Sequence, residues 1–258
     1  MLLSRPIRHD PSVGAQRVHV VRARDVASVT LVTETSVLVN WPLLADLPAE
    51  DVRELLAVAR RRAFARGEVV FHRDDPAESL HLIVRGRFGA RVTTPFGDSV
   101  LLDVLGPGEA FGEIALLLPG ARRSATVSAL EDGETRSVFR DDFARLQRAH
   151  PGVKDVLLRL LAEQLRRASD RIVEAHHVDA ETRVRRRLHE LAGKYGDSEG
   201  DVAVPLTQED LAAMAGTSRA TVNRVLRDEE RRGVVVLARG RVTVVDVEEL
   251  GRRARWNR

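Results

Sequence analysis

The sequence predicts an α+β chain made of a β jelly roll, a long dimerisation helix and a C-terminal winged helix-turn-helix. Short strand-like stretches between glycine turns at residues 63–143 indicate the jelly roll. A narrow apolar stripe after Pro151 indicates the long helix. Two capped helices around a glycine turn, followed by two valine-rich stretches, indicate the winged helix-turn-helix. We therefore expect domains at 41–150, 151–178 and 179–258.

Composition excludes several classes of protein. The 258 residues suffice for one large or two ordinary domains, and 43% of them are hydrophobic. There is no apolar run of about 18 residues, so no membrane span is expected. The first residues lack the apolar block of a secretory signal, so we expect a cytoplasmic protein. The chain has no cysteine, which excludes disulfides, thiolate zinc sites and cysteine-ligated iron–sulfur clusters.

The spacing of the hydrophobic residues changes along the N-terminal half, from helical to strand-like. Residues 1–40 mix valine runs with turn formers, and we expect them to form a flexible extension. A helical pattern begins near Pro48, with acids in its first turn, and continues into the arginines at 60–62. From Ala63 onward the stretches EVVFHR, SLHLIVRG, FGARVTT and SVLLDVLG are typical of strands.

A narrow apolar stripe marks the long helix. Its members recur every three or four residues: Leu157, Leu161, Leu165, Ala168, Ile172 and Ala175. So narrow a stripe favours pairing with a second copy, giving a homodimer, although part of it could pack on the chain's own jelly roll. The stripe ends before Asp179, a good N-cap, so we expect a hinge at Val178 and Asp179. The adjacent His176 and His177 point about 100° apart on a helix, and no metal site is expected.

The segment from Leu206 to Val235 has the layout of a helix-turn-helix. Thr207 with Asp210 predicts a capping box, Gly216 a tight turn, and Ser218 the cap of a second helix. The exposed face of that second helix carries Arg219, Asn223 and Arg224, which suit guanine and adenine edges in the major groove. Thr207, Gln208 and Ser218 lie where helix N-termini contact phosphates. The partner predicted by this segment is double-stranded DNA.

The stretch FGEIALLLPGARRSATV raises a separate question. It is mostly apolar, yet it contains Glu113 and the pair Arg122 and Arg123. A buried charge is costly unless it is paired or binds a ligand.

These motifs together resemble the cyclic-AMP receptor protein/FNR family of bacterial transcription regulators. The resemblance runs from Trp41 to the C-terminus, and GEIALL…RRSATV and GTSRATVNRVL are its most specific segments. It implies a cyclic-nucleotide-binding jelly roll, a palindromic DNA site, contact with RNA polymerase and no enzymatic activity.

The resemblance also implies a ligand site, with cyclic AMP the first candidate and no metal. Glu113 would bond the ribose, and Arg123 and Ser124 the cyclic phosphate, with Gly112 and Ile114 beside them. A threonine, followed by a serine or asparagine, contacts adenine from the long helix in the best-known members. Here these positions are Ala168 and Ser169, so one base contact is lost, and either weaker binding of cyclic AMP or a different cyclic nucleotide becomes plausible.

The second helix of the helix-turn-helix, which we call the recognition helix, departs from the family in one position. Both guanine-reading arginines are present, as Arg219 and Arg224, but the glutamate that accepts from cytosine is replaced by Ala220. We expect a palindromic site that keeps the guanines and is relaxed where the glutamate would read.

Three other hypotheses stay open. The chain could regulate DNA without a ligand, or respond to another small molecule; haem ligation by His72 or His81 is a remote form of this. It could be a cyclic-nucleotide module without DNA binding, such as part of a kinase or channel. An enzyme is disfavoured, because the sequence contains no nucleophile–histidine–acid set, metal cluster or Walker loop.

Overall fold

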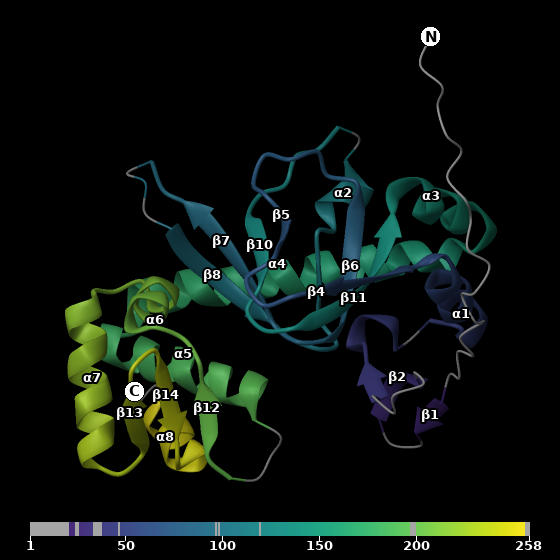
Figure 1. The fold of residues 1–258 in the computed structure, drawn as a ribbon. Helices are drawn as coiled ribbons and strands as arrows, with labels where there is room; N and C mark the ends of the chain where they lie inside the picture. Colours follow the sequence, from purple (N-terminus) through teal and green to yellow (C-terminus); the bar gives the residue numbers. More distant parts are fainter. Residues whose placement is uncertain are drawn as a thin grey trace.

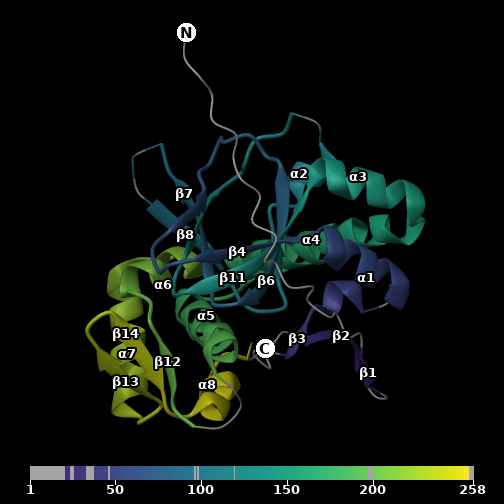
Figure 2. The same cartoon turned by 45° about the vertical axis from the view of Figure 1, so that its right-hand side comes forward.

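The computed structural model describes residues 21–23, 26–32, 38–45, 47–95, 97, 99–118, 120–196 and 200–255 (Figures 1 and 2). Its first elements form a small antiparallel sheet of order β1-β2-β3, made of Val21–Ala23, Val26–Val32 and Leu38–Asn40. This sheet lies in the segment 1–40, where we expected a flexible extension, and β2 falls on one of its valine runs. Residues 1–20 lie outside the described residues, and the flexibility of the extension stays a prediction.

The first long helix is shorter than its pattern predicts. A short 3-10 helix, η1 (Pro42–Leu44), precedes α1 (Ala49–Val58), whose first turn holds the expected acids. The prediction that the arginines at 60–62 continue this helix is wrong, because they begin strand β4 (Arg60–Phe64). This strand lies at the edge of its sheet with its arginines exposed, where charged side chains discourage pairing with other chains.

Two four-stranded antiparallel sheets form the jelly roll. One has the order β5-β10-β7-β8, and the other the order β4-β11-β6-β9. The remaining elements are β5 (Val69–Phe71), β6 (Ser79–Arg85), β7 (Phe88–Thr93), β8 (Ser99–Leu105), β9 (Ala110–Phe111), α2 (Ile114–Leu117), β10 (Thr126–Ala129) and β11 (Gly133–Phe139). The core between the sheets includes Phe64, Ile83, Phe88 and Phe111, all buried.

The apolar residues of the long helix fall into two sets, one buried in the chain's own core and one exposed. After α3 (Arg140–Ala149) and η2 (Pro151–Val153), α4 runs from Lys154 to His177. Leu157 is buried in the core with Trp41 and Leu80, so it belongs to the chain's own jelly roll and not to a dimer surface.

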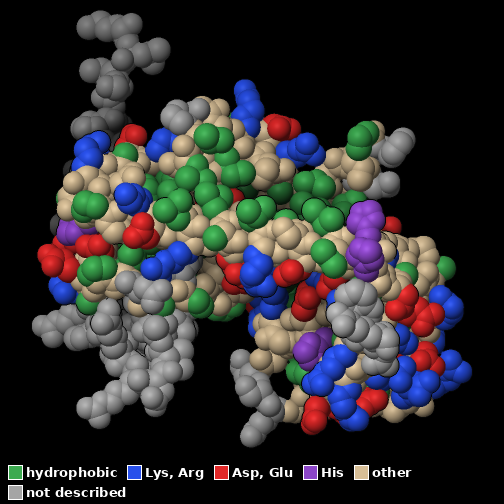
Figure 3. All heavy atoms as spheres, turned by 180° about the vertical axis from the view of Figure 1, so that it is seen from behind, with side chains coloured by type: hydrophobic (Ala, Val, Ile, Leu, Met, Phe, Trp, Pro, Cys, Tyr) green, Lys and Arg blue, Asp and Glu red, His purple; other side chains and the backbone are tan. Residues whose placement is uncertain are grey.

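Further along α4 the apolar side chains are exposed. Exposed fractions are 59% for Leu158, 69% for Leu165 and 62% for Ile172, three residues spaced by seven. Figure 3 shows hydrophobic side chains gathered on the face behind that of Figure 1.

The C-terminal domain is the predicted winged helix-turn-helix. Its elements are α5 (Ala180–Tyr195), β12 (Val202–Val204), α6 (Gln208–Ala215), α7 (Arg219–Arg231), β13 (Val235–Ala238), β14 (Arg241–Val244) and α8 (Val247–Arg253). The capping box of Thr207 and Asp210 is confirmed, as are the caps Asp179 and Ser218. Gly216 has the expected positive φ of 59° at the turn between α6 and α7.

The two domains share a hydrophobic core. Leu101 and Val104 of β8 lie in the same buried cluster as Leu188, Leu211 and Val222 of the C-terminal domain. Figure 1 shows α6 beside β8, with the C-terminal domain against one end of the jelly roll. No helix among the described residues is both long and apolar enough to cross a membrane.

Candidate ligand cavity and candidate nucleic-acid interface

A cavity of about 530 Å³ lies between the jelly roll and α4. It brings together five of the six ligand residues that the sequence predicts: Gly112, Glu113, Ile114, Arg123 and Ser124. Its opposite wall comes from α4 and includes Gln164, Arg167, Ala168, Arg171 and Ile172. A molecule held here would therefore contact the jelly roll and the long helix together.

The guanidinium of Arg123 is held in place by the jelly roll. Its side chain is only 6% exposed and lies 3.9 Å above the ring centroid of Phe71. One terminal nitrogen donates to the carbonyl oxygen of Ser79 at 2.8 Å, and the other donates to the Ser79 hydroxyl at 3.2 Å. Burial lowers the pKa of Arg123, and the negative charge of Glu113 opposes that shift.

Arg123 retains donor capacity in this position. Among the described residues, its Nε is one of the few buried side-chain atoms without a hydrogen-bond partner. Glu113 is also buried, at 8% exposure. Arg123 and Glu113 both line the cavity, and a guanidinium in a cavity wall suits an anionic ligand.

Gly112 is required by the position of Arg123. Its φ is 84°, and a Cβ at this residue would lie 2.6 Å from a terminal nitrogen of Arg123 and 2.8 Å from the Ser79 carbonyl oxygen. Both the backbone conformation and the space therefore exclude any side chain.

A buried histidine lies behind the arginine. His81 Nε2 is 3.2 Å from the Ser79 hydroxyl, and its Nδ1 is 3.1 Å from the hydroxyl of Thr135. Its ring stacks on Phe111 at 5.0 Å. Burial, with the positive charge of Arg123, lowers the pKa of His81 to about 3, so the ring is neutral at pH 7. Both ring nitrogens have protein partners, which favours a structural role over haem ligation.

The structure separates the two residues expected to contact a base. Ala168 lines the cavity, but Ser169 does not and is exposed on α4. Consecutive helical residues point about 100° apart, and Ser169 lies on the side of α4 turned away from the cavity. Arg171 was missed by sequence reasoning; it donates to the Leu102 carbonyl oxygen at 3.2 Å and pairs with Asp103 at 3.3 Å.

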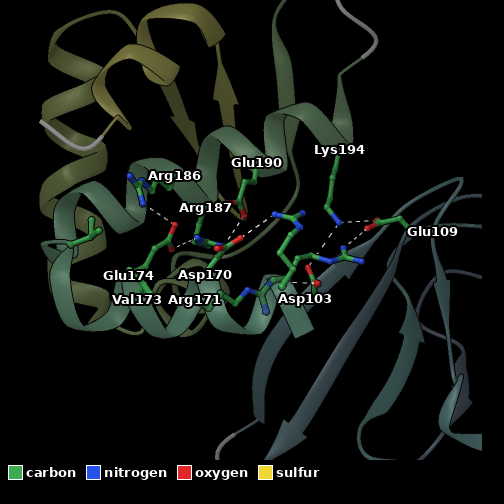
Figure 4. Close-up of a pocket in the computed structure, with 13 residues that line it drawn as sticks. Asp103, Glu109, Asp170, Arg171, Val173, Glu174, Arg186, Arg187, Glu190 and Lys194 are labelled. Carbon is green, nitrogen blue, oxygen red and sulfur yellow. Dashed lines mark hydrogen bonds and ion pairs between the residues drawn. The ribbon is translucent and has the colours of Figure 1, made fainter. Parts of the chain in front are cut away.

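A network of ion pairs joins this wall to the C-terminal domain (Figure 4). It surrounds a second cavity of about 560 Å³, which shares Asp103, Arg167 and Arg171 with the first. The carboxylate of Glu109 lies 2.7 Å from Lys194 Nζ and 3.1 Å from Arg167. Burial alone would raise the pKa of Glu109, but the charge and hydrogen bond of Lys194, with the Gly106 N–H and the charge of Arg167, together outweigh it and lower that pKa.

Two further contacts fix the domains together. Arg91 of β7 pairs at 2.8 Å with Asp210, the residue that closes the capping box of α6. Arg87 donates to the carbonyl oxygen of Lys194 at 2.7 Å and lies 4.3 Å from the ring centroid of Tyr195. Sequence reasoning missed these partners because they are distant in the chain.

The predicted DNA residues gather on one face of the C-terminal domain. Thr207, Ser218, Arg219, Ala220, Asn223 and Arg224 are all exposed, and Gln208 is half-buried. Asn223 on α7 donates to the Gln208 side-chain oxygen at 3.1 Å, which links the recognition helix to the start of α6.

The β13–β14 hairpin, which is the wing of the domain, adds two arginines to this face. A hollow of about 420 Å³ between α6, α7 and the β13–β14 hairpin is lined by Thr207, Gln208, Arg219 and Asn223, and by Arg239 and Arg241 of the wing. Both wing arginines are exposed, as a phosphate contact requires. The sequence signal was the Arg-Gly-Arg turn of the hairpin. Among the described residues, no cluster of histidine or acidic side chains could hold a metal ion.

Comparisons with known proteins agree with this arrangement. A model of the cyclic nucleotide-binding domain matches residues 61–150, and a model of the Crp-like helix-turn-helix domain matches residues 182–253. The chain is 35% identical over 195 residues to the CRP-like cAMP-activated global transcriptional regulator of Mycobacterium tuberculosis, covering 74% of this chain and 87% of that protein.

Two Thermus thermophilus proteins are also similar. The chain is 37% identical over 203 residues to the cyclic AMP receptor protein, with 79% of this chain and 92% of that protein covered. A solved structure of a CRP-family transcriptional regulator from the same organism is 27% identical, with a TM-score of 0.62 over 75% of this chain and 96% of that one.

A nucleotide-binding domain joined to a helix-turn-helix defines a DNA-binding transcription regulator and not an enzyme. The chain belongs to the CRP/FNR family of transcription regulators, with a cyclic nucleotide-binding domain and a Crp-like helix-turn-helix domain.

Proposed function

We propose that this protein is a homodimeric regulator whose binding to a palindromic DNA site is controlled by a cyclic nucleotide, with cyclic AMP as the first candidate. The observation that carries the proposal is the buried, partly unpartnered guanidinium of Arg123 in a cavity that α4 closes. The similar regulator of Mycobacterium tuberculosis is described as cAMP-activated, which supports this choice of ligand.

Each half of the ligand would meet a different wall of the cavity. Arg123 and Ser124 would hold the cyclic phosphate, because a guanidinium supplies paired donors to an anion. Glu113 would accept a hydrogen bond from the ribose hydroxyl. The base would lie against α4, near Ala168. Ser169 is exposed outside this cavity, so in the proposed dimer it would serve the second copy.

The exposed stripe of α4 supports the dimer. Leu158, Leu165 and Ile172 are each more than half exposed and repeat every seven residues, which is the spacing of a coiled-coil seam. A two-fold dimer would present two copies of α7 to DNA, and its site would then be a palindrome.

Coupling between ligand and DNA would pass through α4. The helix forms one wall of the cavity and ends at its C-cap Val178, directly before the cap of α5. A ligand shifts the balance between two arrangements only if it binds one of them more tightly.

The DNA face would read bases mainly through arginine. Arg219 and Arg224 would pair with guanines and Asn223 with adenine, while Thr207, Gln208, Ser218 and the wing arginines contact phosphates. Ala220 would leave the neighbouring position relaxed. The DNA-bound dimer would then contact RNA polymerase, as the family assignment suggests.

Binding calorimetry with Arg123→Leu tests the ligand site. We expect wild-type protein to bind cyclic AMP and the variant to lose at least about tenfold in affinity, since a hydrogen bond to a charged group is worth about 1.5–3 kcal/mol. Arg122→Leu is the matched control, because that neighbour is exposed and its side chain bonds only the Asp74 carbonyl oxygen in the described part of the chain.

Cyclic GMP in the same titration tests the choice of base. If neither nucleotide binds at millimolar concentration, control by a cyclic nucleotide is refuted. DNA selected from a random pool by gel shift tests the other half of the proposal, and recovery of no preferred sequence would contradict it.

A second candidate keeps the DNA-binding role but changes the effector. It is favoured by Ala168, which offers no hydrogen bond to a base at the cavity wall. Under this alternative, another small molecule or none would control the protein, and Arg123→Leu would leave DNA binding unchanged.

A further inference from the structure

A carboxylate lies beside one of the arginines proposed to read DNA. Arg224 of α7 is exposed, and a terminal nitrogen of its guanidinium lies 3.1 Å from a carboxylate oxygen of Glu181. Glu181 comes from a different helix, in the first turn of α5. The pair therefore lies at the junction between the recognition helix and the helix that follows the hinge.

Glu181 is itself anchored to the core of the domain. Its second carboxylate oxygen lies 3.6 Å from Arg185, one turn further along α5. Arg185 is only 11% exposed and pairs at 2.6 Å with Glu229 of α7, whose side chain is fully buried. Arg253 of α8 lies 2.9 Å from the other oxygen of Glu229. A row of ion pairs thus runs from the buried core to the exposed Arg224.

An acid in the first turn of α5 suits the helix dipole, but the pairing of Glu181 with Arg224 is not explained by stability or by affinity for DNA. An exposed ion pair contributes little to stability. A carboxylate near the DNA face also works against the attraction between arginines and phosphates. What the contact can do is restrict the guanidinium, whose planar fork must meet guanine in one orientation.

We propose that Glu181 is a positioning residue that orients Arg224 for guanine and thereby sharpens base discrimination at that position. The inference rests on the proposed function, because it requires α7 to read base edges. One nitrogen held by Glu181 leaves the remaining donors of the fork to face the base. Without that contact, the long side chain would also reach phosphates or other bases.

The test compares Glu181→Gln with wild type on DNA selected by the wild-type protein. The position read by Arg224 is first located as the base pair whose preference is lost in Arg224→Ala. Wild type should discriminate there by roughly 5- to 150-fold, as expected for a well-placed base contact. Glu181→Gln should reduce that discrimination several-fold while leaving other positions unchanged, and binding to random DNA should be equal or tighter.

Glu209→Gln is the matched control. Glu209 is exposed in the first turn of α6 and lines the hollow of the DNA face. Its substitution removes the same charge from that face, so it should change affinity for all sequences alike. A double variant, Glu181→Gln with Arg224→Ala, should discriminate no worse than Arg224→Ala alone.

The inference is overturned if Glu181→Gln keeps full discrimination at the Arg224 position, or only changes the affinity for all sequences alike, as the control does. A wild-type protein that selects no sequence would overturn the proposed function, and this inference with it. A wild-type protein that selects a sequence, with Glu181→Gln unchanged, would remove this inference alone. Equal melting temperatures of wild type and Glu181→Gln exclude misfolding as the cause.

Discussion

Lys194 and Glu109 join the two domains by an ion pair of 2.7 Å. The same carboxylate is 3.1 Å from Arg167, which lines the proposed ligand cavity. The side chain of Glu109 therefore contacts both α4, at the wall of the cavity, and α5, the first helix of the C-terminal domain.

This ion pair should make stability depend on pH in the acid range. The pKa of Glu109 is lowered in the folded protein, so its contribution is present above the unfolded value of 4.5 and is lost as pH falls through the lowered pKa. Glu109→Gln should cost about 2 kcal/mol at pH 7 and flatten that decline. Urea unfolding at pH 3–7 measures this. Glu54→Gln, at an exposed site on α1, should behave as wild type.

His81 should make stability depend on pH over a higher range than Glu109 does. Its pKa is about 3 in the folded protein and 6.5 in the unfolded chain, so the unfolded chain binds a proton first as pH falls. Stability should therefore fall from about pH 6.5 downward, by up to ~1.4 kcal/mol per pH unit. His81→Phe should start less stable, because Ser79 and Thr135 lose a partner, yet show a flatter profile below that pH. An unchanged slope in that variant would contradict the assignment.

Restoring a hydroxyl at the cavity wall should strengthen ligand binding. Ala168→Thr should increase the affinity for cyclic AMP by about fivefold, the value of one neutral hydrogen bond of about 1 kcal/mol. Calorimetry with cyclic AMP and cyclic GMP measures both the gain and its selectivity. Ala162→Thr, also exposed on α4 but outside the cavity, should leave affinity unchanged. If the variant gains affinity for neither nucleotide, the base does not lie beside residue 168.

A charge in the stripe of α4 should separate the proposed dimer. Leu165→Asp places a carboxylate on a side chain that is 69% exposed in one chain and buried in the dimer that we propose. Light scattering should then report the monomer mass, and affinity for the palindrome should fall. Val236→Asp, 54% exposed on the wing, should remain dimeric. A Leu165→Asp variant that keeps the mass of a dimer would place the interface on another surface.

Local signals made much of the fold predictable. The capping box at Thr207, the turn at Gly216 and the strand stretches of the jelly roll each depend on a few neighbouring residues. The five cavity residues from Gly112 to Ser124 came from the resemblance to the family, whose motif matches one short segment, and the structure brings them to one cavity.

The errors share a physical cause. The arginines at 60–62 continue the α1 pattern, and only pairing with β11, which is distant in the chain, makes them a strand. The sequence does not show which of Leu157 and Leu158 is buried, because that depends on packing in the core that contains Trp41. Arg171 and the partners of Glu109 lie on elements far apart in the sequence, where no local pattern could pair them.

The core shared across the domain boundary limits how this protein can be divided. Leu101 and Val104 of β8 are fully buried, in the same cluster as residues of α5, α6 and α7. A fragment starting at Asp179 would leave its side of that cluster in water, and a fragment ending at Val178 would expose the β8 side. Each half made alone is therefore an aggregation hazard. A chimera that exchanges helix-turn-helix domains between relatives must carry a matching β8 surface to fold properly.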